Sequence, residues 1–181
     1  MNVKGISHLA RQDLIVEEFG EVRWRDFMNG WLQSHPGFPA QILPITKLPL
    51  EPYLQLQEAV LREFYSGDRM AWWHIGIKSA AVALTTGQLK GLFRPGETRR
   101  FLLFMPNVFR GYFDGGELTV ASKGDAVEVA ITGVPPHLYF EYGVMGFVQG
   151  GMQLLDPKSQ PGKRVRGFSI GDPDVLYAFK G

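Results

Sequence analysis

The sequence predicts an α+β domain, in which a helical N-terminal two-thirds packs on a four-stranded antiparallel sheet. Apolar residues recur at the helical spacing of about 3.6 residues through most of residues 7–113. From residue 117 on, the apolar spacing falls to two in four short segments, which is the period of a strand. One apolar helix at 136–155 separates the two pairs of segments. We therefore expect a hairpin, a helix and a second hairpin at the C-terminus.

The first two helices are predicted at residues 7–19 and 21–34, where apolar side chains form one stripe in each segment. Gly20 separates the two helices, because glycine favours the position just after the last helical residue. The His-Pro-Gly-Phe-Pro run at 35–39 ends the second helix. The next stretch, 40–52, carries three prolines and is predicted to be extended chain.

A third helix is predicted to begin at Pro52, since proline suits the first helical turn, and to stop at Gly67. Asp68 is a suitable N-cap for a fourth helix over 69–84, because its carboxylate can accept from a free backbone N–H. Weaker helical character continues through 85–92.

A fifth helix over 97–105 meets Pro106, which we expect to break or kink it before helix resumes over 107–113. Gly-Asp and Gly-Asp-Pro turns inside the two alternating pairs then predict two hairpins. The four strands are expected at 117–122, 126–132, 164–170 and 175–179.

The helix predicted at 136–155 is unusual because it contains four glycines. Gly143, Gly146 and Gly150 step by three and four, so they share one helical face, with Gly151 beside it. Each glycine within a helix costs about 1 kcal/mol relative to alanine. We expect a compensating close approach to the sheet, to a second copy or to a ligand, and favour close packing over a cavity.

Composition limits the function classes. The 181 residues suffice for a single domain, with a helical part at 1–116 and a sheet-containing part at 117–181. Nineteen Lys and Arg against eighteen Asp and Glu give a net charge of +1, so we expect no nucleic-acid partner. No run is apolar for long enough to span a membrane, and no secretory signal is present, so we expect a cytoplasmic protein.

The sequence shows no catalytic constellation. Its histidines lack the spacing of a helical metal pair, and no zinc-protease, P-loop, dinucleotide or nucleophile-elbow motif occurs. The absence of cysteine excludes thiolate nucleophiles and Cys-ligated metals. We therefore expect no metal, no cofactor and no enzymatic activity. The histidines are His8, His35, His74 and His137.

Two clusters have both a structural and a functional interpretation. We expect Trp73 to lie in the core, Trp72 to line an interface or pocket, and His74 to point outward. Glu141 stands among aromatic residues and could be a buried acid of raised pKa, but we favour an exposed position on the polar edge of its helix.

A small basic cluster lies in the third predicted strand. Strand alternation puts Arg164 and Arg166 on one face and Lys163 on the other. Because the whole chain is nearly neutral, this cluster alone does not indicate a nucleic-acid site.

Five short segments follow one another in the order Val3-Lys4-Gly5, Glu18-Phe19-Gly20, Arg94-Pro95-Gly96, Tyr112-Phe113-Asp114-Gly115-Gly116 and Gly171-Asp172-Pro173. In this order and spacing they resemble an uncharacterised myxobacterial protein family of similar length. That family is in turn distantly similar to the 4-vinyl-reductase domain and to Bet3-type vesicle-tethering subunits, and the start of the chain also resembles haem–nitric-oxide-binding domains.

The resemblance implies a domain that dimerises and, in several relatives, holds a small apolar ligand in a tunnel. It does not imply a metal. Ser169 and Val175 stand near the places of the cysteines that 4-vinyl-reductase domains carry in their last hairpin. The Tyr-x-Ser-x-Arg signature of haem–nitric-oxide-binding domains is absent, so we expect no haem.

Two function hypotheses follow. The first is a non-enzymatic sensory domain that binds a small hydrophobic molecule and signals through protein contacts. The second is a homodimeric protein-interaction module, regulatory or scaffolding, that has no ligand. For the first hypothesis we expect the pocket to be lined by Trp72, Tyr139, Tyr142, Gly143, Gly146, Phe147 and Gly150.

Overall fold

The computed structural model describes residues 1–180. Its chain forms two compact units. Unit 1 comprises Met1–Ala71 and Gly111–Asp114, and unit 2 comprises Trp72–Arg110 and the chain from Gly115 on. Each unit is described by itself below. That they act as a single domain stays a prediction.

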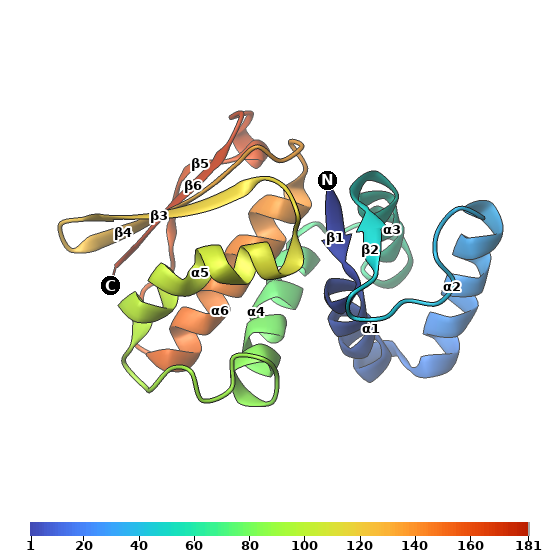
Figure 1. The fold of residues 1–181 in the computed structure, drawn as a ribbon, viewed down its shortest axis with the longest axis horizontal. Helices are drawn as coiled ribbons and strands as arrows, with labels where there is room; N and C mark the ends of the chain where they lie inside the picture. The colour runs from blue at the N-terminus through green and yellow to red at the C-terminus, as the bar shows by residue number, and fades with distance from the viewer. Residues whose placement is uncertain (181) are drawn as a thin grey trace. The chain divides into compact units, whose positions relative to one another are not determined.

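Unit 1 is built from three helices and a short two-stranded sheet (Figure 1). Strand β1 (Asn2–Lys4) pairs antiparallel with β2 (Lys47–Pro49), and Val3 lies opposite Leu48. Both of these side chains are fully buried. The helices confirm the predicted boundaries to within two residues at most ends. They are α1 (Gly5–Phe19), α2 (Glu21–Ser34) and α3 (Leu50–Phe64).

Unit 2 places helices against one face of a four-stranded sheet (Figure 1). The strand order β3-β4-β6-β5 is antiparallel throughout, which confirms the predicted α+β class. The elements are α4 (Met70–Thr85), α5 (Thr98–Tyr112), β3 (Glu117–Lys123), β4 (Ala126–Thr132), the π-helix η1 (Tyr139–Val144), α6 (Met145–Leu155), β5 (Lys163–Arg166), the 3₁₀-helix η2 (Phe168–Ile170) and β6 (Val175–Lys180).

Side-chain alternation decides which face of the sheet is buried. Val127, Val129 and Ile131 of β4 are fully buried, and the residues between them are half-buried. On β6, Tyr177 lies opposite Val129 and Phe179 lies opposite Val127, so both rings point to the same buried face. The sheet therefore presents a continuous apolar surface to the helices of unit 2.

Two helical predictions are corrected. Of residues 85–92, only Thr85 belongs to α4, because the N–H groups of Gly87 and Leu89 bond back to the carbonyls of Val82 and Ala83 and turn the chain out of the helix. Pro106 does not break α5, which runs from Thr98 to Tyr112. The fully buried side chains of Phe101 and Leu102 anchor this helix despite the hydrogen bond that proline removes.

The third predicted strand is shorter than expected. Strand β5 ends at Arg166, and the residues expected to extend it form the turn of η2. The reason is that side chains take the backbone donors: Gly167 N–H bonds to an Asp172 carboxylate oxygen at 2.9 Å, and Ser169 N–H bonds to a Glu141 carboxylate oxygen at 2.8 Å. Backbone N–H groups that donate to side chains cannot also donate to a neighbouring strand.

The glycine face of α6 lies against another helix, α4, and not against the sheet. A Cβ atom on Gly150 would stand 2.6 Å from the Cα atom of Ile77, and one on Gly76 would stand 2.5 Å from the Gly143 carbonyl oxygen. At Gly146 the nearest groups are the Trp73 carbonyl oxygen and, at 3.0 Å, the Trp73 Cα atom. Glycines on both helices thus allow backbone-to-backbone contact, as predicted for this face, with a different partner.

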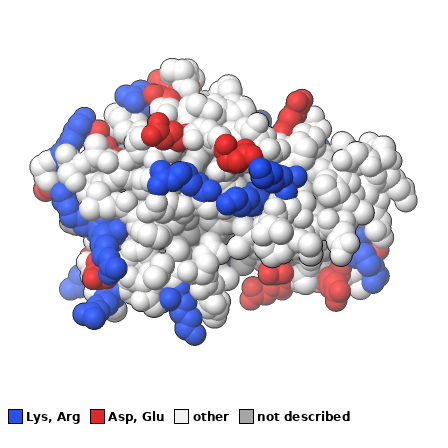
Figure 2. All heavy atoms as spheres, viewed as in Figure 1, with Lys and Arg blue, Asp and Glu red and all other residues white. Residues whose placement is uncertain are grey.

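Charge is unevenly divided between the units. Unit 2 holds twelve Lys and Arg against eight Asp and Glu, whereas unit 1 holds seven against ten. Figure 2 shows Lys and Arg atoms gathered around unit 2 on the face in view. The near-neutral total is therefore the sum of a basic unit 2 and an acidic unit 1, and the expectation of no nucleic-acid partner stays a prediction.

Within residues 1–180, no helix combines the length and the apolar character needed to cross a bilayer.

The α4–α6 contact gives a first prediction. Gly146→Ala is expected to lower the free energy of unfolding by about 1–3 kcal/mol, because the new methyl group would overlap the Trp73 backbone. Gly143→Ala is the matched control: its methyl group would lie 3.8 Å from the Tyr139 ring, so its stability should be unchanged or higher by up to about 1 kcal/mol. Urea denaturation followed by circular dichroism measures both. A stabilised Gly146→Ala would contradict the close contact.

Candidate functional site

Unit 2 contains a fully buried carboxylate, that of Glu141. Glu141 belongs to η1, a six-residue π-helix that leads directly into α6. Such wide turns are rare and are often found at functional sites. The sequence interpretation that placed Glu141 on an exposed polar edge is therefore wrong.

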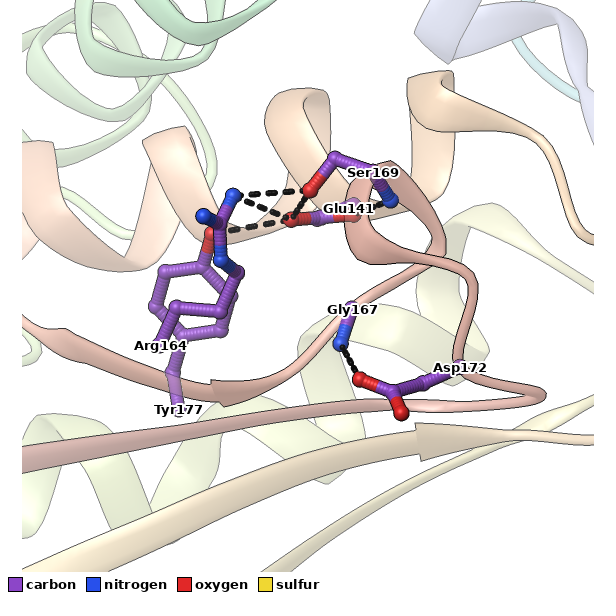
Figure 3. A network of polar contacts seen from close by, with 6 residues as sticks. All are labelled: Glu141, Arg164, Gly167, Ser169, Asp172 and Tyr177. Carbon is purple, nitrogen blue, oxygen red and sulfur yellow. Dashed lines mark hydrogen bonds and ion pairs between the residues drawn. The ribbon is translucent and has the colours of Figure 1, made fainter.

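Four groups surround the Glu141 carboxylate (Figure 3). Oxygen Oε1 accepts from the Ser169 hydroxyl at 2.7 Å and from the Tyr177 hydroxyl at 3.2 Å, and it lies 3.5 Å from Arg164 Nη1. Oxygen Oε2 accepts from the Ser169 N–H at 2.8 Å. Arg164 Nη1 also donates to the Ser169 hydroxyl at 2.7 Å, which closes the network. A buried charge needs such partners to offset its lost hydration.

The network changes the chemistry of its members. Burial, together with the Glu141 charge, raises the pKa of the Tyr177 hydroxyl above its ordinary value, so this group stays a proton donor. The network is also tightly enclosed: a Cβ atom on Gly167 would lie 2.5 Å from Glu141 Oε1. Sequence analysis recognised Arg164 and Glu141 separately. It did not predict their contact. The aromatic residues beside Glu141 were the available indication that this carboxylate is buried and therefore needs a partner such as Arg164.

The second prediction tests this network. Glu141→Leu should cost about 3–5 kcal/mol of unfolding free energy, because it leaves the Ser169 N–H, the Tyr177 hydroxyl and the Arg164 charge without their acceptor. The control is Glu128→Gln, which removes an ion pair to the exposed Lys123 and should cost less than about 1 kcal/mol. Denaturation curves compare the two, and equal losses would contradict a central role for Glu141.

Two of the residues predicted to line a pocket lie together. Trp72 is fully buried, its ring centre is 6.1 Å from that of Tyr139, and the His137 ring lies 5.3 Å from it. The buried Nε1–H of Trp72 has no hydrogen-bond acceptor among residues 1–180. Trp73, which was expected in the core, is half-buried, while His74 is exposed as expected.

The remaining members of the predicted pocket divide into two groups. Gly146 and Gly150 face the α4 backbone, as described above. Gly143 faces the Tyr139 ring at ordinary contact distance, Phe147 is buried, and Tyr142 is half-buried. The assignment of these residues to a ligand pocket stays a prediction.

Unit 1 contains a solvent-open hollow of about 680 Å³ between the end of α1, the start of α2 and the end of α3. The Arg23 guanidinium lies 5.3 Å from the Phe19 ring centre and 5.0 Å from that of Phe64, and it donates to the Glu63 carbonyl oxygen at 2.7 Å. The hollow is thus lined by aromatic and aliphatic side chains, by carboxylates and by the Arg23 guanidinium. Its lining includes Phe19, Val22, Phe27, Glu21, Asp26 and Glu63.

The histidines are engaged separately. The His8 ring lies among Trp24 and Phe38, at 5.8 and 6.4 Å. The His35 ring stacks on Trp31 at 3.5 Å. His137 Nδ1 accepts from the Tyr139 N–H at 3.1 Å, so a neutral His137 carries its proton on Nε2. Throughout residues 1–180, no three His, Cys, Asp or Glu side chains gather in a way that could hold a metal ion.

His8 gives a third prediction. Burial and then the Arg11 charge lower its pKa from 6.5 to about 4. Between these values the unfolded chain binds more protons than the folded one. The His8 contribution to stability is therefore full above pH 6.5 and is lost as the pH falls toward 4, by an amount on the order of 3 kcal/mol. Denaturation at several pH values should show a shallower acid slope for His8→Phe than for the wild-type chain, and equal slopes would contradict the prediction.

Solved structures of similar fold were found. An H-NOX protein from S. oneidensis in the Fe(II)NO ligation state aligns with a TM-score of 0.70 at 14% identity, covering 98% of each chain. A mutant of T. tengcongensis H-NOX aligns with a TM-score of 0.67 at 16% identity, covering 98% of this chain and 96% of that one. A structure from a study of haem redox potential and porphyrin distortion gives 0.67 at 15% identity, over 98% and 99%.

These likenesses show that the chain has the H-NOX fold over nearly its whole length. No protein-family model matches the sequence, and no curated protein matches it. The resemblance to the 4-vinyl-reductase domain and to Bet3-type subunits stays a prediction.

The fold raises the question of haem, and the contacts of the four histidines do not indicate an axial ligand among them. Haem iron requires an axial His, Cys, Met or Tyr ligand that faces the porphyrin. The chain has no cysteine, His8 is enclosed by aromatic rings, and His137 Nδ1 is already an acceptor. His35 stacks on Trp31 and His74 is exposed. The hollow of unit 1 has no His, Cys, Met or Tyr in its lining.

Proposed function

We propose that this chain is a non-catalytic sensory domain, which holds a small apolar molecule without a metal and passes on its bound state through protein contacts. The observation that carries the proposal is the H-NOX fold, which aligns over 98% of both chains with a protein described in an iron–nitric-oxide state. The iron belongs to that protein. The scaffold is what this chain shares.

The buried cluster of Trp72, Tyr139 and His137 supports a ligand in unit 2. Its rings offer apolar surface, and the unpartnered Trp72 Nε1–H offers one hydrogen-bond donor. A buried donor without an acceptor costs about 1–3 kcal/mol, which a ligand acceptor would recover. The ligand class is therefore an apolar molecule with one carbonyl, ester or ether oxygen.

One observation favours the second hypothesis, a homodimeric interaction module without a ligand. The α4 backbone fills the face of α6 on which Gly146 and Gly150 lie, so these two residues contribute close packing. In this alternative the shared fold serves contacts between proteins.

The fourth prediction separates the two. Native mass spectrometry of the full chain purified from cells is expected to show one retained small molecule per chain, released by denaturing solvent. Trp72→Phe removes the N–H and keeps a buried ring, so it should remain folded and lose the molecule. Trp73→Phe is the control and should retain it. A ligand-free dimer would support the alternative, and a ligand-free monomer would contradict both.

A further inference from the structure

Two arginines precede Ser169 in a pattern that has no part in the proposed function. Arg164 and Arg166 stand five and three residues before this serine in Arg-Val-Arg-Gly-Phe-Ser. One class of protein kinases selects serines by arginines placed in this way, because charge patterns set kinase–substrate specificity. We propose that Ser169 is a phosphorylation site for an arginine-directed serine/threonine kinase, and that a phosphate there releases residues 167–172 from η1.

The surrounding chain suits a kinase substrate. All four residues of β5 are exposed, as are Ile170 and Gly171 after the serine. Strand β5 is a short edge strand that pairs with β6 alone, and its register is irregular between Arg164 and Arg166. Strand β5 has one partner strand, so opening this segment toward a kinase active site requires breaking only the β5–β6 pairing and the contacts with Glu141.

Arg164 and Arg166 form ion pairs in the folded chain, but these ion pairs do not prevent recognition of the two arginines by a kinase once the segment opens. Arg166 bonds to Asp174 at 2.6 Å, and Arg164 reaches Glu141 and Ser169. These contacts give both arginines a structural role in the closed state. Figure 3 shows those of Arg164. When the segment opens, both guanidinium groups become available to the acidic groups of a kinase.

The chemistry is a phosphoryl transfer. The Ser169 hydroxyl oxygen attacks the γ-phosphorus of an ATP bound to the kinase, the oxygen–phosphorus bond forms, and the bond to ADP breaks. The hydroxyl proton passes to the kinase's catalytic base. The product carries a charge of about −1.5 to −2 at neutral pH.

The closed network cannot accept that product. The serine oxygen lies 2.7 Å from Glu141 Oε1, and after transfer it has no proton to donate. Two anions would then be in contact, in a place where Gly167 already packs tightly against the carboxylate. Arg164 would be drawn from Glu141 to the phosphate, since phosphate accepts the stronger charge-assisted hydrogen bonds. The segment therefore leaves η1.

The fifth prediction concerns the site of modification. The full chain is incubated with ATP and a purified kinase selective for arginine at these two positions, and the phosphate is located by peptide mass spectrometry. We expect phosphate on Ser169 and none on Ser122 or Ser159. Arg166→Gln should slow labelling at least about tenfold, because it removes one of the two charges that the kinase recognises. Lys163→Gln, outside the pattern, should label normally. Failure to label Ser169 in the folded wild-type chain would overturn the proposal.

The release is measured by hydrogen exchange on the phosphorylated chain. Amides of residues 167–172 should exchange at least about tenfold faster than in the unmodified chain, as expected for a local opening. Ser169→Glu should reproduce the effect, Ser169→Thr should not, and Glu141→Gln combined with Ser169→Glu should lessen it by removing the facing charge. If Ser169→Glu fails to fold, the phosphorylated wild-type chain still decides. Phosphate on Ser169 with unchanged exchange would overturn the release.

Discussion

Backbone contact between α4 and α6 is the constraint on which the rest of unit 2 depends. Gly76, Gly146 and Gly150 remove the side chains that would otherwise hold the two helices apart. The contact costs helix propensity at each glycine and gains dispersion over closely packed backbone. On its other side α6 presents Gly151 to the ring of Phe101 on α5. The same helix is thereby fixed between two others.

The second constraint is electrostatic. Because η1 runs directly into α6, fixing α6 also fixes where the Glu141 carboxylate lies. A fully buried carboxylate must have partners, and the C-terminal segment supplies them through Arg164, Ser169 and Tyr177. The end of β5 and the turn of η2 are consequences of that demand. The release that we propose for a phosphate on Ser169 would act through the same partners.

The chain shares its backbone fold with H-NOX proteins, but that likeness does not assign a function to its side chains. Its backbone follows H-NOX proteins over nearly the full length, yet its histidines are buried among rings, stacked, exposed or already bonded. A scaffold can be kept while its site chemistry differs, since function resides in particular side chains. The side chains that carry the chemistry proposed for this chain are the aromatic cluster around Trp72 and the network around Glu141.

Features set by neighbours along the chain could be predicted from the sequence. Gly20 separates α1 from α2, Asp68 accepts the Met70 N–H at the start of α4, and the β3–β4 hairpin follows its period of two. Caps, turns and periodicity depend on residues a few positions apart, so they can be predicted from the sequence alone. The shared face of the glycines in α6 could be predicted for the same reason, because helical spacing alone brings these residues together.

Features set by distant residues were decided by the tertiary structure. Strand β1 forms against β2 more than forty residues away along the chain, with Val3 opposite Leu48. The strand predicted to reach residue 170 ends at Arg166, because Glu141, 28 positions before Ser169, takes that serine's N–H. Burial of Glu141 and the choice of α4 as partner of the glycine face have the same origin. The sequence shows which polar groups require hydrogen-bond partners if they are buried. Only the folded chain determines which distant residues supply those partners.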